Sequence, residues 1–124
     1  HITETQNQAK LIETCLHRYD KSYSGLKDLG GKMTAMGQAM GGMMVNDEIV
    51  KGAQMGYVFE NLEIASYEIL IAAAKAVGDA ETADICTRIL AEEVAMAEWM
   101  RSHLAELTQA YLTRAAEPHT EAKR

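Results

Sequence analysis

The sequence is poor in proline, the residue that interrupts helices most strongly. It has one proline in 124 residues, and nowhere does it show the strict alternation of apolar and polar residues that is typical of strands. A soluble globular composition with this strong helical bias predicts an all-α chain. Its length corresponds to a single domain with one modest core.

Clusters of basic residues are also missing, and the formal net charge is −6. Nucleic acid and anionic membranes are bound chiefly through cationic side chains, so both are excluded as expected partners. The sequence lacks a long apolar run as well, because even "ILIAAAKAV" is interrupted by Lys75. Without a signal peptide, we expect a cytoplasmic protein.

Cysteine is scarce. Cys15 and Cys86 each fall on an apolar helical stripe, which suits buried thiols in a reducing compartment better than a disulfide framework. No phosphate loop, Cys-x-x-Cys or nucleophile arrangement of Ser, His and Asp is present. His17, His103 and His119 are expected at the surface. Hydrolase and kinase chemistry therefore have no support.

The periodicity of apolar residues and the stop signals between them predict four helices. In the first, the apolar face reads Ile2, Ala9, Ile12, Leu16 and Tyr19. Asn46 or Asp47 can cap the third helix, while Gly78 ends it and Asp79 caps the fourth. The predicted helices span about 1–22, 31–44, 47–77 and 80–115.

The third and fourth helices are long, and the turn that joins them is tight. They must therefore lie antiparallel, and other helices are needed to cover their apolar faces. We expect an antiparallel helical bundle over residues 1–116 and a flexible tail over 117–124. The second helix is rich in Gly and Met, and its methionine stripe is better explained by adaptable packing or a subunit contact than by copper binding.

Two predicted core helices carry acids among their apolar residues. Glu60 and Glu63 lie on the stripe that includes Phe59 and Tyr67, while Glu93 interrupts the apolar stripe of the fourth helix. Glu92 flanks that stripe, beside Trp99, which is expected to be a core or interface anchor. Tyr67 is expected in the core, with its hydroxyl on an acid or, alternatively, as a redox participant.

An ionised carboxylate buried without a partner costs several kcal/mol, comparable with the stability of a whole domain. These acids must therefore be protonated, paired with a base such as Lys10, Arg88 or Arg101, kept hydrated, or bound to a cation. The first helix adds His1 and Glu4 on one face. Histidine with several carboxylates from different helices of a bundle is the arrangement that holds two transition metals in ferritin-like proteins.

The segments "HITETQNQAKLI" and "ENLEIASYEILIAAAKAVGDAETADICTRILAEEVAMAEWM" resemble the YciE/YciF family of bacterial ferritin-like proteins. Its "H-x-x-E-T" motif falls on His1, Glu4 and Thr5. The resemblance covers residues 1 to about 112 and implies a commonly dimeric bundle associated with stress responses, with no established reaction. It also implies a further helix, absent from this chain, ahead of His1.

The resemblance implies a metal site whose ligands come from three helices. The Glu-x-x-His pattern usual in di-iron sites is not repeated, since Ala95 and Met96 stand three residues after Glu92 and Glu93. The segment at residues 1–12 corresponds to the second helix of the family. In it, Thr3 and Gln6 stand where an acid and a histidine would strengthen the site. The predicted ligands are His1, Glu4, Glu60, Glu63, Glu92 and Glu93.

Two hypotheses from different classes follow. In the first, the acids bind iron, manganese or zinc, and any reaction is of the di-metal oxidase or peroxide type. In the second, the chain is a metal-free structural or interaction protein that acts as a homodimer, with the acids satisfied by hydrogen bonds. Both hypotheses share one fold and expect a homo-oligomer.

Overall fold

The computed structural model describes residues 2–19 and 48–117, which form three helices. These are α1 (Ile2–Arg18), α3 (Glu48–Ala76) and α4 (Ala80–Ala116). Their bounds agree with the predicted ones, apart from an earlier end for the first helix. The predicted Gly- and Met-rich helix at 31–44, His1 and residues 118–124 of the tail lie outside the described residues.

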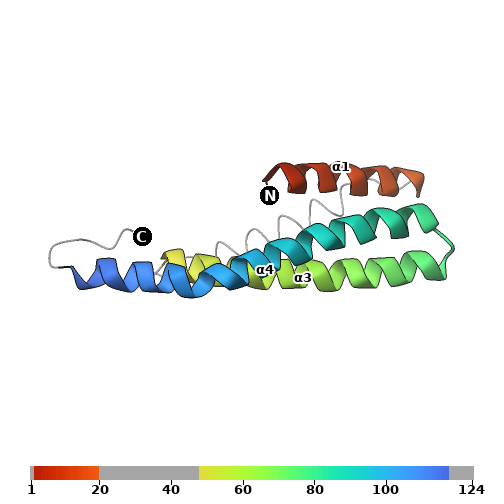
Figure 1. Ribbon diagram of the computed structural model, residues 1–124. Helices are drawn as coiled ribbons and strands as arrows, with labels where there is room; N and C mark the ends of the chain where they lie inside the picture. Colours follow the sequence, from red (N-terminus) through yellow and green to blue (C-terminus); the bar gives the residue numbers. More distant parts are fainter. Residues whose placement is uncertain (1, 20–47, 118–124) are drawn as a thin grey trace.

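Helices α3 and α4 run antiparallel and side by side, as Figure 1 shows. The link between them is a Schellman turn, in which the N–H of Asp79 donates to the carbonyl of Ala74 (2.9 Å) and the N–H of Gly78 donates to that of Lys75 (3.2 Å). Gly78 takes the left-handed conformation that this turn requires, with φ of 76°. The predicted glycine stop is thereby confirmed.

Asp79 begins the next helix immediately, as predicted. Its carboxylate accepts a hydrogen bond from the backbone N–H of Thr82 (3.0 Å), so the first turn of α4 is capped. The same carboxylate accepts from the hydroxyl of Tyr19 at 2.6 Å, and Arg18 reaches Glu81 at 2.7 Å. The end of α1 is thus tied to the beginning of α4.

Helix α1 lies along the half of the α3–α4 pair that is nearest the turn (Figure 1). The core there is built on Cys15, Ile85 and Ile89, with Leu11, Ile12 and Tyr67 packed against it. Both cysteines are buried and free, as expected.

The face that α1 turns inward differs from the predicted stripe. Ile2 and Tyr19 are 79% and 51% exposed, whereas Gln8 and Cys15 are buried. Ile12 and Leu16 of the predicted stripe are only half-buried. The buried side of α1 is therefore rotated from the predicted stripe toward the polar Gln8, because Cys15 and Leu11 make the contact that orients α1 on α4.

The all-α bundle expected from the sequence is confirmed in the described helices. On α4 the predicted interior stripe is confirmed over Cys86, Ile89, Glu93 and Ala97, which are all buried, whereas its continuation from Met100 to Tyr111 is only half-buried. None of the described helices combines the length and the apolarity that crossing a membrane requires.

Candidate metal centre

Three carboxyl groups meet between α3 and the first half of α4. Glu60 and Glu63 stand one helical turn apart on α3, and Glu93 projects from the buried stripe of α4. One carboxylate oxygen of each lies within 4.8 Å of the others. We call Glu60, Glu63 and Glu93 the acid triad.

The acid triad is partly sealed from water. Glu93 is 1% exposed and Glu60 is 6% exposed, while Glu63 lies at the accessible side. Glu63 therefore leaves a route by which a small ion can reach the two buried members. Carboxylates are normally exposed and hydrated, so the burial of two of these three acids is unusual.

Burial and crowding change the acid–base behaviour of the triad. Desolvation, followed by the interactions with Glu93 and with the charge of Glu63, raises the pKa of Glu60 to about 8. Desolvation and the carboxyl of Glu93 raise the pKa of Glu63 to about 7. Protons or a cation must therefore neutralise part of the triad near neutral pH.

Hydrogen bonding leaves one oxygen of Glu93 available. Its Oε1 accepts from the side-chain amide of Gln8 at 2.5 Å, and this bond is buried. Its Oε2 is buried and has no hydrogen-bond partner among the residues that the structure describes. A buried acceptor in this condition is costly, and a cation is one group that can satisfy it.

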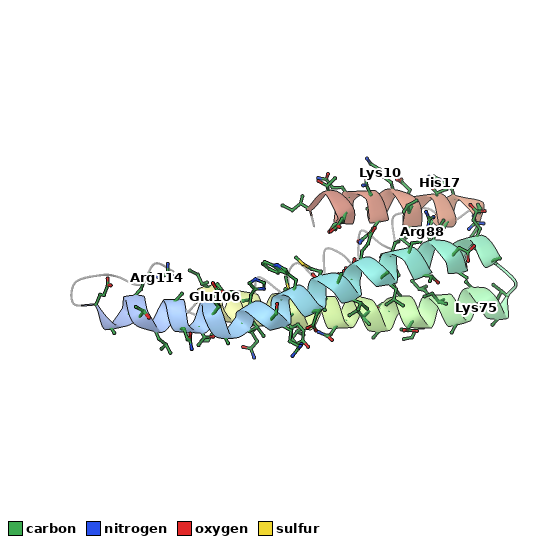
Figure 2. The ribbon with its side chains drawn as sticks, viewed as in Figure 1. Lys10, His17, Lys75, Arg88, Glu106 and Arg114 are labelled. Atoms are coloured by element: carbon green, nitrogen blue, oxygen red, sulfur yellow. The ribbon has the colours of Figure 1, made fainter. Side chains whose placement is uncertain are left out.

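The three bases considered from the sequence do not neutralise the triad. Arg101 instead pairs with Glu98 at 2.7 Å, and Figure 2 shows Lys10 on the side of α1 that faces away from α4. Arg88 is exposed, and the groups that shift the pKa of Glu60 and Glu63 are all carboxyls. Pairing with a base is thus not how the described part of the chain stabilises these acids.

The other predicted ligands lie apart from the triad. Glu92 is exposed and accepts a hydrogen bond from Gln8 at 2.8 Å. Glu4 is exposed too, and both acids line an open groove that also includes Met96 and Trp99. His1 is outside the described residues. The structure therefore gathers three of the six predicted ligands and places two more on the neighbouring groove.

Gln8 is the residue that the sequence reasoning missed. It lies one heptad before Cys15 and four residues after Glu4, so the burial of Cys15 would have placed it on the inner face of the first helix. An isolated glutamine on an amphipathic helix gives no other signal. Its importance comes from two acids that stand more than eighty positions away in the sequence.

Tyr67 lies in the core, as expected, where it packs against the cluster around Cys15 and Ile89. Burial, together with the charges of Glu63 and Glu93, raises the pKa of its hydroxyl to about 12. The phenol is therefore neutral at physiological pH and stands beside an acidic site.

Trp99 was expected to anchor either the core or an interface, and the structure shows that it is not in the core. It is 54% exposed and stacks on His103, with ring centroids 4.2 Å apart. Its alternative role as an interface anchor stays a prediction.

Residues 1–113 match the family described as Domain of unknown function (DUF892). This chain belongs to the DUF892 family. Among solved structures, the chain is similar to a protein from Xanthomonas campestris pv. campestris, which is 34% identical in sequence. The match covers 94% of this chain and 72% of that one, with a TM-score of 0.72. The DUF892 bundle of this chain is thus similar to a fold already seen in a crystal.

Proposed function

We propose that this DUF892 chain is a ferritin-like bacterial protein of the YciE/YciF type, associated with stress responses, whose acid triad binds a divalent transition-metal ion. The observation that supports the proposal is the convergence of three carboxylates from two helices on one point, with a buried oxygen of Glu93 unsatisfied. A divalent ion would relieve both the repulsion among the acids and the unsatisfied acceptor.

The donor set narrows the choice of ion. Carboxylate oxygens favour hard or borderline ions, so manganese and iron fit the triad best, zinc remains compatible, and a soft ion such as Cu(I) is disfavoured. A bound transition metal would supply Lewis-acid chemistry, and iron or manganese would add redox chemistry with dioxygen or peroxide. In the fuller form of the proposal, Glu4, Glu92 and His1 contribute to a second ion nearby.

Elemental analysis of protein purified without chelator tests the proposal. The wild-type protein is expected to contain manganese, iron or zinc in stoichiometric amounts. Replacing Glu93 or Glu63 by Gln keeps the size of the side chain and removes its charge, so either variant should lose the metal. Glu106→Gln is the matched control, because Glu106 is an exposed acid on the part of α4 that extends beyond α1 (Figure 2).

Two outcomes would contradict the metal proposal. One is wild-type protein that takes up no manganese, iron or zinc even after reconstitution. The other is metal content that is the same in Glu93→Gln and in Glu106→Gln, which would place any bound ion somewhere other than the triad.

The second candidate function is that of a metal-free homodimer, and an apolar stripe on α3 favours it. Val58, Leu62 and Ile69 are 51%, 46% and 69% exposed, and their spacing puts them along one side of the helix. A second copy of the chain would bury this stripe, which we call the α3 apolar stripe. The acidic net charge of −6 disfavours nucleic acid and anionic membranes as the partner.

A further inference from the structure

Gln8 is the only neutral polar residue in the buried core of the described chain, and it stands beside the acid triad without belonging to it. Its side chain is 5% exposed. The amide nitrogen donates to Oε1 of Glu93 at 2.5 Å and to Oε2 of Glu92 at 2.8 Å. An amide –NH₂ has two hydrogens, and here each is directed at a different carboxylate.

The position of this amide determines what Glu93 can offer to an ion. Consecutive residues of a helix point about 100° apart, so an amide that bridges Glu92 and Glu93 must enter from a neighbouring helix, which is α1. The bond from Gln8 occupies Oε1 and holds the rotamer of Glu93. Oε2, which has no described hydrogen-bond partner, is the oxygen left to meet Glu60 and Glu63.

The chemistry of glutamine suits this role better than that of a base. A lysine or arginine at this place would pair with Glu93 and cancel the charge that attracts a cation. A neutral amide donates hydrogen bonds without cancelling that charge. Groups that bond metal ligands in this way commonly orient the ligand and tune its affinity.

We propose that Gln8 is a positioning residue of the triad: by holding Oε1 of Glu93, it presents Oε2 of Glu93 as a single ligand oxygen to a divalent ion shared with Glu60 and Glu63. This inference rests on the proposed metal-binding function. It also makes α1 part of the site, although α1 supplies no member of the triad.

Binding of Mn²⁺ alone, measured by electron paramagnetic resonance on the full chain, tests the inference. Gln8→Met retains the length of the side chain and removes both N–H donors. We expect it to weaken Mn²⁺ binding by about 10- to 100-fold, in line with the loss of other ligand-orienting groups. Gln109→Met is the matched control, since Gln109 is an exposed glutamine of α4 more than four helical turns from Glu93, and the affinity of this variant should equal that of the wild type.

A third variant separates positioning from a merely structural role. Gln8→Glu loses the donors but adds a carboxylate beside the triad, so it should lower the melting temperature of the metal-free protein, as Gln8→Met does. Its affinity for Mn²⁺ should nevertheless match or exceed that of the wild type, because more negative charge faces the ion. The two variants thus change stability in the same direction, whereas only Gln8→Met loses affinity for Mn²⁺.

The inference is overturned if Gln8→Met binds Mn²⁺ as tightly as the wild type. It is also overturned if both Gln8 variants lose affinity equally and in step with their melting temperatures, because Gln8 would then only hold α1 in place. Wild-type protein that binds no Mn²⁺, iron or zinc would instead refute the metal site itself, and the role of Gln8 with it.

Discussion

At the scale of the residue, Glu93 is a buried acid whose burial is costly for this bundle. It is 1% exposed and shares its surroundings with two other acids, yet no basic side chain pairs with it among the described residues. The amide of Gln8 satisfies one of its oxygens, and the other faces only the acids of the triad. A core position that tolerates such a cost is more readily explained by ligand binding than by stability.

The raised pKa of Glu60 predicts an unusual dependence of stability on pH. The pKa rises from an ordinary 4.5 to about 8 on folding, so the folded state holds this proton more tightly than the unfolded state does. The stabilising contribution is complete below about pH 4.5 and is lost as pH rises through 8. The melting temperature of the metal-free protein should therefore fall between pH 5 and pH 9, by an amount corresponding to a few kcal/mol.

Thermal unfolding in the presence of a chelator measures this effect. Glu60→Gln removes one of the two acids with a raised pKa and should make the profile less steep, with the contribution of Glu63 remaining, whereas Glu106→Gln should leave it unchanged. Adding Mn²⁺ should stabilise the protein most at the alkaline end, where protons no longer compete for the triad. A wild-type melting temperature that rises steadily from pH 5 to pH 9 would contradict this reading of Glu60.

At the scale of the element, the short turn between α3 and α4 determines how the two long helices meet. Gly78 provides the positive φ of the Schellman turn, and Asp79 both completes that turn and caps α4. The hydroxyl of Tyr19 and the guanidinium of Arg18 also reach this carboxylate. The same few residues therefore fix the hairpin and anchor the end of α1.

Gly78 and Gly52 should respond to alanine with opposite signs. A β-carbon at either position meets no atom within 4 Å, so crowding does not decide the result. Gly78→Ala forces a left-handed conformation on an L side chain and should destabilise the fold by about 1 kcal/mol. Gly52→Ala lies within α3 and should stabilise it by roughly 0.5 to 1 kcal/mol. Urea unfolding measures both, and equal effects of one sign would refute the assigned backbone conformations.

Two substitutions of Asp79 should show whether capping α4 or anchoring the end of α1 contributes more to stability. The hydrogen bonds from Thr82 and Tyr19 lower the pKa of Asp79 well below its usual range, and the charge of Arg18 adds to this. Asp79→Ala removes cap and tether together and should lower the melting temperature by roughly 5 °C. Asp79→Asn keeps a good capping side chain and should cost less. If the two variants unfold at the same temperature, the charge rather than the cap is what stabilises this end of the bundle.

At the scale of the whole molecule, α1 accompanies only the half of the α3–α4 pair near the turn, and the rest of α4 continues past it (Figure 1). The α3 apolar stripe is exposed although α3 is rich in apolar residues throughout. Helices that are apolar on most sides are normally covered on most sides. Association between copies is the simplest way for the described helices to bury this surface.

Charged substitutions on the α3 apolar stripe should therefore weaken self-association. We expect the wild-type protein to be a dimer or larger assembly, and the double variant Leu62→Lys with Ile69→Lys to shift toward monomer because two charges would be buried at the interface. Asn61→Lys with Glu68→Lys is the comparison, because these exposed residues directly precede Leu62 and Ile69 and so point about 100° away from them. Light scattering coupled to size-exclusion chromatography measures the mass. A wild-type monomer at all concentrations would refute the homodimer.

The sequence by itself determined the helices and much of the interior of this protein. Apolar periodicity, one glycine stop and one aspartate cap were enough to define α3 and α4, because these signals act within a few residues of the chain. The same local logic placed Glu93 on a buried stripe and both cysteines in the core. It also brought Glu60 and Glu63 to one side of α3, since residues three apart on a helix share a face.

Only the tertiary structure decided which acids meet. Glu60, Glu63 and Glu93 lie together because of the register between two antiparallel helices, which no local pattern specifies. The packing of α1 against α4 places Glu4 and Glu92 on a groove beside them. The rotation of α1 placed Gln8 inward and left Ile2 exposed. Its hydrogen bonds to Glu92 and Glu93 join residues far apart in the chain, so they exist only once the helices have packed.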